Sequence, residues 1–330
     1  MDRNVYHYNK MKKIPALLAV LLIVIMFAAV VYTNQKAIIF PEIAALALGA
    51  WVMETPPWYC TNLSLWLSPS LAALTGMIIV RYFPYSPVFM TAGAFAIVIL
   101  QLKLLRSAIM PSISAAILPV ITHCDSWYYP LSVFVLTGTI AFGRLVMNRY
   151  ASAGFAESLL KIPELIKSGD DVTASELKHC GKLLAGVVAV SVIAAKCNLL
   201  FMIAPPLIVA FVELSKPDGT LRRKSRSILF LLVFAAFSGV LWLYFITNVL
   251  LWPIWIFACL ATTSVFLMYR FMRLPFPPAV AIALLPAIIP TASLWSYPWH
   301  VLFGSSAFIL ISMLWFGKNN FAFMLGGRYD

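Results

Sequence analysis

The sequence predicts an all-α, polytopic membrane protein, and its composition and charge-free stretches carry this prediction. Of the 330 residues, 62% are hydrophobic and only 11% are charged, whereas soluble domains carry about 25% charged residues. Mean hydropathy is +0.92. Uncharged stretches such as 227–269 and 274–317 are long enough to cross the bilayer as helices, which takes about 20 residues. Nothing alternates with period two, so a membrane barrel is not expected.

The net charge of +12 does not indicate a nucleic-acid partner. Basic residues stand singly or in small groups at the ends of hydrophobic spans, as in the cytoplasmic loops of membrane proteins. A nucleic-acid-binding domain would gather them on one face. We therefore expect the lipid bilayer as the surroundings of this chain.

Enzymatic chemistry is not expected. The five cysteines have neither metal-ligand nor redox spacing, and we interpret them as small apolar fillers. No arrangement of side chains indicates a nucleophile, paired catalytic carboxylates or metal ligands. The sequence thus predicts no catalytic residue, no metal site and no cofactor.

Six hydrophobic segments are expected in each half of the chain. In the first half they lie at 14–32, 37–53, 61–80, 86–105, 109–122 and 127–147. In the second half they lie at 182–196, 199–214, 227–246, 249–269, 276–292 and 296–316. The first segment follows a basic start but is longer than the apolar core of a signal peptide, so we expect it to be retained.

A polar linker at 148–181 is expected between a first membrane unit at 1–147 and a second at 182–330. Its apolar residues allow one short amphipathic helix on the membrane surface. An ordinary connector is the favoured alternative. The apolar residues are Phe155, Leu159, Leu160, Ile162, Leu165 and Ile166.

The second half repeats the first. Three residues recur 167 positions later: Arg106, Pro111 and Pro119 as Arg273, Pro278 and Pro286 (273 − 106, 278 − 111, 286 − 119). The motif that ends at Gly76 recurs at Gly239, with a separation of 163 (239 − 76). The four-residue difference is about one helical turn. We therefore expect two six-segment repeats.

Charge distribution predicts the topology. If all segments cross and the N-terminus is cytoplasmic, 21 of the 24 Lys and Arg residues lie inside, and only Lys36, Arg81 and Lys196 lie outside (24 − 3 = 21). Re-entrant fifth segments would move the basic cluster at 216–226 outside, which is disfavoured. We expect the protein to lie in the plasma membrane of a bacterium, with both termini in the cytoplasm. Three segments precede three in each half, so we expect inverted triplets within parallel halves, a known transporter plan.

The second and fifth segments of each half are short and begin with proline, at Pro41, Pro111, Pro206 and Pro278. Proline favours a first helical turn after extended residues, which would place each helix N-terminus below the membrane surface. Such an end carries free N–H groups and partial positive charge, so it can hold a small anion. Alternatively, these prolines start or kink ordinary spanning helices.

Glu42 is the one candidate ionisable group of this site. The helix dipole favours a carboxylate in a first turn, and an ionisable residue inside a membrane indicates function. A buried Glu42 would repel an anion unless protonated, which fits proton coupling or a cationic substrate; interfacial capping is the alternative. Its expected counterpart is Leu207. The candidate binding residues are Pro41, Glu42, Pro111, Ser112, Pro206 and Pro278.

The stretch from Phe276 to Pro286, FPPAVAIALLP, resembles the signature segment of the HPP family of integral membrane proteins. In that family His-Pro-Pro precedes a small-residue run ending in Leu-Leu-Pro. Ala204-Pro-Pro-Leu, the loop 216–226 and the stretch 234–239 resemble earlier family segments in the same order. The resemblance covers most of 200–316 and, through the repeat, reaches 37–147, so the chain looks like two fused units.

The resemblance implies a small-anion transporter, because plant members of the family are linked to nitrite transport. The chain departs from the pattern where Phe276 and Met110 stand in place of the signature histidine, and most family glycines are missing. These departures leave the substrate open. A second resemblance, to exporters of the fusaric-acid-resistance type, rests on a short helix, a basic loop and a glycine-containing helix.

We therefore expect a transporter or permease of a small solute, with a small anion such as nitrite as one candidate. The alternatives are a non-transporting scaffold or accessory subunit and an exporter of aromatic acids. A transporter should have a polar, water-accessible cavity at the proline-led ends, whereas a scaffold should be packed dry there. Assembly as a homo-oligomer is left open.

Overall fold

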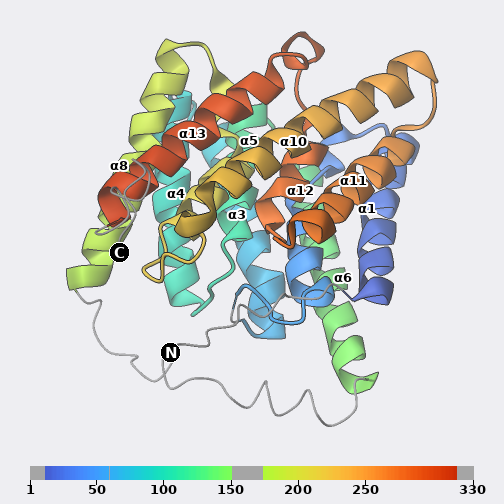
Figure 1. Ribbon diagram of the computed structural model, residues 1–330, viewed down its shortest axis with the longest axis horizontal. Coiled ribbons are helices and arrows are strands. Elements are labelled where there is room, and N and C mark those ends of the chain that lie inside the picture. The colour runs from blue at the N-terminus through green and yellow to red at the C-terminus, as the bar shows by residue number, and fades with distance from the viewer. Residues whose placement is uncertain (1–11, 59, 151–173, 318–330) are drawn as a thin grey trace, which may run out of the picture.

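The computed structural model of the protein describes residues 12–58, 60–150 and 174–317, and throughout these residues its regular structure is helical, with no β-strand (Figure 1). Eight of the described helices are long and apolar enough to cross a membrane. They are α1 (Lys13–Thr33), α3 (Asn62–Tyr82), α4 (Pro87–Leu104), α6 (Tyr128–Tyr150), α8 (Ala174–Lys196), α10 (Ser225–Tyr244), α11 (Ile254–Met272) and α13 (Tyr297–Phe316). The prediction of an all-α, multi-pass membrane protein is confirmed.

Four other helices are shorter and begin at or beside the predicted prolines. They are α2 (Glu42–Ala47), α5 (Pro111–Thr122), α9 (Pro205–Leu214) and α12 (Pro277–Leu284). At 1.5 Å per residue, none of them approaches the roughly 30 Å of the bilayer core. Single turns of 3-10 or π-helix complete the chain: η1 (Lys36–Ile38), η2 (Leu48–Val52), η4 (Leu200–Ile203), η5 (Arg222–Lys224), η6 (Phe245–Val249), η7 (Leu285–Ala287) and η8 (Thr291–Ser293).

Burial separates the short helices from the long ones. All residues of α2, α9 and α12 are buried, and so are those of α5 from Pro111 to Ile121. The long helices expose large apolar side chains, such as Leu17 of α1 and Leu310 of α13. An extensive exposed apolar surface is typical of contact with a membrane. The short helices therefore form the core, and the long helices surround it.

The four short helices form a closed ring. α2 packs against α5 and α12, and α9 packs against the same two helices. Outside the ring, α3 contacts α5 and α6, while α10 contacts α12 and α13. α1 packs on α11 and α8 packs on α4, so the first helix of each half lies against the other half (Figure 1).

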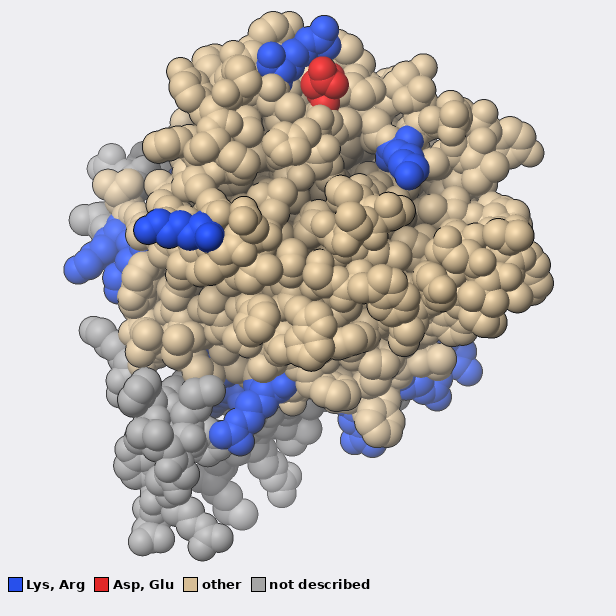
Figure 2. All heavy atoms as spheres, turned by 90° about the horizontal axis from the view of Figure 1, so that it is seen from above, with Lys and Arg blue, Asp and Glu red and all other residues tan. Residues whose placement is uncertain are grey.

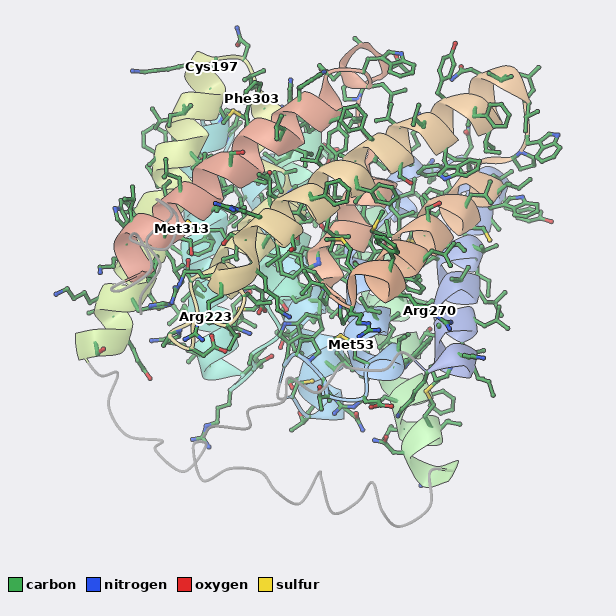
Figure 3. The ribbon with its side chains drawn as sticks, in the orientation of Figure 1. Met53, Cys197, Arg223, Arg270, Phe303 and Met313 are labelled. Carbon is green, nitrogen blue, oxygen red and sulfur yellow. The ribbon has the colours of Figure 1, made fainter. Side chains whose placement is uncertain are left out.

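The C-terminal ends of α8 and α11 lie on opposite sides of the molecule. Figure 3 places Met53, Arg223 and Arg270 in the lower half of the view, and Cys197 and Phe303 in the upper part. Seen from above, the molecule shows few charged side chains, and most of them stand far apart (Figure 2). A surface so poor in charge agrees with the hydrophobic composition.

Helices extend into the expected linker, 148–181, from both sides. α6 continues to Tyr150, and α8 begins at Ala174, inside the expected linker. Polar residues in the first turns of α8 do not prevent a helix, since long cationic side chains can reach water from a helix end. The predicted amphipathic segment, from Phe155 to Ile166, lies outside the described residues.

A proline inside α5 leaves one backbone carbonyl group without its helical hydrogen-bond donor, and a tyrosine hydroxyl donates to it instead. Pro119 has no N–H, so the carbonyl oxygen of Ala115 lacks its usual partner four residues later. The Tyr129 hydroxyl of α6 donates a hydrogen bond to that oxygen at 2.7 Å. Because lipid offers no hydrogen bonds, this contact lets a proline-containing helix lie in the core.

Several structural features of the first half of the chain occur again in the second half. The Tyr297 hydroxyl donates to the Ile282 carbonyl oxygen at 2.9 Å, and Pro286 again stands four residues after that carbonyl. Two close helix crossings exclude any side chain, because a β-carbon would overlap a carbonyl oxygen: Gly76 lies against Ala116, and Gly239 against Ala283. Positive φ angles also occur in pairs near helix ends, at Asn34 and Asn198 and at Arg106 and Arg273.

Removal of the Tyr129 hydroxyl tests whether its hydrogen bond to the Ala115 carbonyl oxygen stabilises the fold. Tyr129→Phe should lower the free energy of unfolding by about 1 kcal/mol, because the Ala115 carbonyl then has no partner. In a Pro119→Ala background the same change should cost almost nothing, since the alanine N–H supplies the bond. Unfolding in mixed micelles, followed by circular dichroism, measures both effects. An equal loss in the two backgrounds would contradict this account.

Candidate functional site

Glu42 lies in the interior of the helical bundle. It begins α2, directly after Pro41, and its side chain is 1% exposed. The Ser114 hydroxyl of α5 donates a hydrogen bond to Glu42 Oε1 at 2.7 Å. Glu42 Oε2 has no hydrogen-bond partner among the described residues. This burial does not fit capping at the membrane interface, and it leaves half of the carboxyl group unsatisfied.

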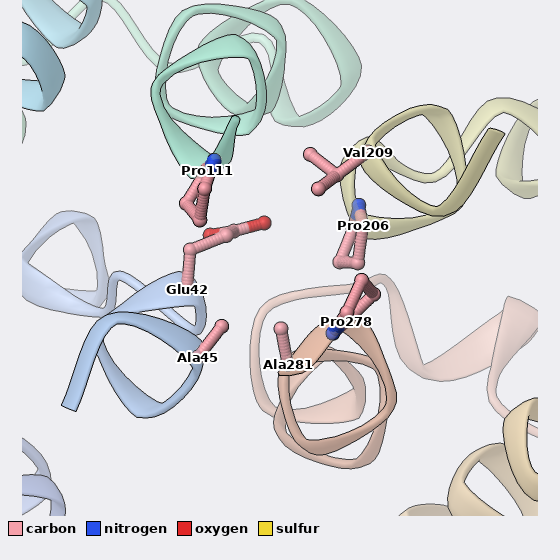
Figure 4. Close-up of a pocket in the computed structure, with 7 residues that line it drawn as sticks. All are labelled: Glu42, Ala45, Pro111, Pro206, Val209, Pro278 and Ala281. Atoms are coloured by element: carbon pink, nitrogen blue, oxygen red, sulfur yellow. The ribbon is translucent and has the colours of Figure 1, made fainter. Parts of the chain in front are cut away.

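The first turns of the four short helices surround one small pocket, and the Glu42 carboxyl group points into it (Figure 4). Each of α2, α9 and α12 lines the pocket with two residues that are three positions apart. This spacing places both residues on the same face of their helix. The lining residues are Glu42, Ala45, Pro111, Pro206, Val209, Pro278 and Ala281.

The structure brings together four of the six predicted binding residues. Glu42, Pro111, Pro206 and Pro278 line the pocket. Pro41 and Ser112 are buried but are not in the lining, and the Ser112 hydroxyl has no hydrogen-bond partner among the described residues. Ser114 and the second member of each pair were missed. They lie three residues after the first-turn residues, on the same helix face, and this spacing could have predicted them.

The pocket is small and almost entirely apolar. Its empty volume is about 200 Å³, and the centre of a water molecule can occupy about 10 Å³ of it. That is room for roughly one water. Apart from Glu42, the lining side chains are those of proline, alanine and valine. The site is therefore narrow and apolar, unlike the polar, water-accessible cavity expected of an open transporter.

The expected free N–H groups are not found at three of these helix starts. The paired prolines that begin α9 and α12 have no N–H, and the next N–H groups, those of Leu207 and Ala279, donate to the carbonyl oxygens three residues earlier. The Val280 N–H donates to the Tyr269 hydroxyl at 3.1 Å. In α5, the N–H groups of Ser112 and Ile113 are likewise bonded to preceding carbonyls. The prolines present rings to the pocket, and these first-turn donors are already used.

All polar groups at the pocket come from the first half of the chain. Around the ring, Glu42 and Ala45 of α2 correspond to Pro206 and Val209 of α9. Among the residues that line the pocket, α9 contributes Pro206 and not Leu207, the residue that the sequence repeat pairs with Glu42. By the 167-residue separation, the counterparts of Ser112 and Ser114 in α12 are Ala279 and Ala281 (112 + 167, 114 + 167).

A second buried polar cluster joins the loop after α2 to the end of α9. Trp58 Nε1 donates to Glu213 Oε1 at 3.0 Å, and Lys216 Nζ lies 2.6 Å from Glu213 Oε2. The Trp58 ring packs against Gly49, where a β-carbon would overlap it. The cluster connects the two halves away from the pocket, and no pattern in the sequence indicated it.

Among the described residues, no group of three or more His, Cys, Asp or Glu side chains is placed to hold a metal ion. Comparisons with protein-family models, curated proteins and solved structures found no match to this chain. The resemblance to the HPP family therefore stays a prediction, and function has to be argued from the pocket.

The Glu42–Ser114 hydrogen bond can be tested with a double-mutant cycle. Ser114→Ala should lower the free energy of unfolding by about 1 kcal/mol, because it removes the donor to a buried carboxyl group. In a Glu42→Leu background the same substitution should be nearly neutral. Thermal unfolding in detergent measures both. Equal effects in the two backgrounds would mean that Ser114 contributes through packing alone.

Proposed function

We propose that this protein is a membrane transporter of a small solute, and that the solute passes between the first turns of α2, α5, α9 and α12. The observation that carries the proposal is the Glu42 carboxyl group, 1% exposed and with one oxygen unpaired, at the meeting point of four buried helices. Ionisable groups are costly inside a membrane and mark solute or ion pathways. Short helices that meet between repeats are the usual binding sites of secondary transporters.

The proposal includes a duplicated architecture, in which two six-segment units enclose the site. Equivalent contacts support it: Tyr129 with Ala115 and Tyr297 with Ile282, and the glycine crossings of α3 on α5 and of α10 on α12. The crossed packing of α1 on α11 and of α8 on α4 also relates the halves. Two units of this kind can rock against each other around a fixed site, which is how alternating access works.

A small anion such as nitrite is the first solute to test, on the strength of the family resemblance. Because the first-turn N–H groups of α5, α9 and α12 are bonded, an anion would depend on a protonated Glu42 as its hydrogen-bond donor. The pocket has room for roughly one water, so passage of a larger solute requires the ring of short helices to widen.

A non-transporting scaffold or accessory subunit is the second candidate. It is favoured by the same small, apolar pocket, since a scaffold needs no pathway and packs its core closely. Solute flux separates the two candidates.

We propose that each short helix crosses the membrane together with the chain segments beside it, and that both termini lie in the cytoplasm, at the plasma membrane of a bacterium. This topology can be tested with a native cysteine. Cys197 is the exposed one among five cysteines. A membrane-impermeant maleimide should label it in intact spheroplasts, and Cys197→Ser should abolish that labelling. In the Cys197→Ser background, Arg223→Cys should react only after permeabilisation. The reverse pattern would invert the topology.

Transport itself can be tested in proteoliposomes with nitrite, nitrate and an aromatic acid. Ala45→Leu and Ala281→Leu should reduce uptake to the level of protein-free liposomes, because leucine fills the pocket. Ala96→Leu, at an exposed position of α4, should keep the wild-type rate. Size-exclusion chromatography checks the fold of each variant. Absence of flux for every solute would favour the scaffold.

A further inference from the structure

We infer that Glu42 is a proton-binding site and that the proton, not a metal cation, is the ion coupled to transport. The inference rests on the proposed function for its coupling step, but the proton site itself stands on the geometry of the pocket. Glu42 is the only pocket-lining residue with a side chain that can gain or lose a proton. Its carboxyl group is fully enclosed by the described helices.

The two carboxyl oxygens differ in a way that fits one proton. Oε1 accepts the hydrogen bond of Ser114 at 2.7 Å, whereas Oε2 has no partner among the described residues. The carboxyl group that carries them points into the pocket. A buried, ionised carboxylate with one unpaired oxygen is costly, since the single hydrogen bond from Ser114 compensates its charge only in part. Binding one proton on Oε2 removes the charge and leaves the Ser114 bond in place.

A metal cation fits this pocket poorly. Hard cations such as Ca²⁺ and Mg²⁺ take six or more oxygen ligands. The lining supplies one carboxyl group, and its other side chains are proline rings, alanine methyls and a valine. A single oxygen is enough for a proton, and roughly one water fits beside it.

The groups around α2 supply no countercharge at the pocket. α5 and α12 contain no residue that titrates near neutral pH. From α6, the Tyr129 hydroxyl is engaged with Ala115, and Arg144 donates to Cys60. Tyr297 of α13 is engaged with Ile282. The Lys13 and Tyr32 side chains of α1 are exposed at the ends of that helix.

Protonation also provides the donor that an anion needs. On Oε2 the proton makes Glu42 a neutral acid whose O–H can donate to an oxygen of the solute in the pocket. Release of the proton restores the carboxylate, which repels the anion out of the site. One proton and one monovalent anion then move together, with no bond formed or broken other than the O–H bond. Rejection of the anion by ionised Glu42 makes the coupling obligatory.

Infrared spectroscopy tests the proton site without any solute. In reconstituted wild-type protein, the carbonyl band of a protonated carboxylic acid should titrate with pH. It should vanish in Glu42→Gln and persist in Glu42→Asp and in Glu54→Gln, a change at an exposed position. The Asp variant keeps the test valid if Gln disturbs folding. A band unaffected by Glu42→Gln, or no band at all, would overturn the inference.

Uptake of nitrite into proteoliposomes tests the coupling. For one proton per anion, an inward gradient of one pH unit should drive about tenfold accumulation, and a sodium gradient at equal pH should drive none. Accumulation driven by sodium instead would overturn the inference. A Glu42 band without flux of nitrite, nitrate or an aromatic acid would support the proton site and overturn the proposed function, so the two failures are distinguishable.

Discussion

Inside lipid every backbone N–H and C=O group needs a hydrogen-bond partner within the protein, and this requirement explains most of the architecture. Four helices are too short to cross the bilayer, so their ends lie where no water can pair with them. The chain meets this constraint by burying them in a ring inside eight long helices. Prolines remove N–H groups from the helix starts, and the Tyr129 and Tyr297 hydroxyls pair carbonyls that later prolines leave free.

The same constraint shapes the pocket. Because first-turn N–H groups are removed by proline or bonded to preceding carbonyls, the pocket walls are rings and methyl groups. In such surroundings a single carboxyl group dominates the chemistry, since nothing else in the lining carries charge or donates a hydrogen bond. The sequence argument for an anion held by helix N–H groups therefore gives way to an argument centred on Glu42.

The two halves share backbone contacts but differ in chemistry. Glycine crossings and tyrosine bonds occur in both, because each is required for close packing of a short helix. At the pocket, α2 contributes Glu42 where α9 contributes Pro206, and the residues 167 positions after Ser112 and Ser114 are Ala279 and Ala281. One half thus carries the polar groups and the other an apolar wall, which leaves room for one proton and not two.

The helical membrane class, the proline starts of the short helices and the candidate Glu42 could be predicted from the sequence, because hydropathy and proline stereochemistry act locally. It did not show that Ser114 meets Glu42, that Pro206 and not Leu207 lies opposite, or that Trp58 reaches Glu213. Those pairings depend on how helices distant in sequence cross and rotate. These pairings are visible only in the folded protein, because the register of one helix against another is set by side-chain packing over the whole bundle.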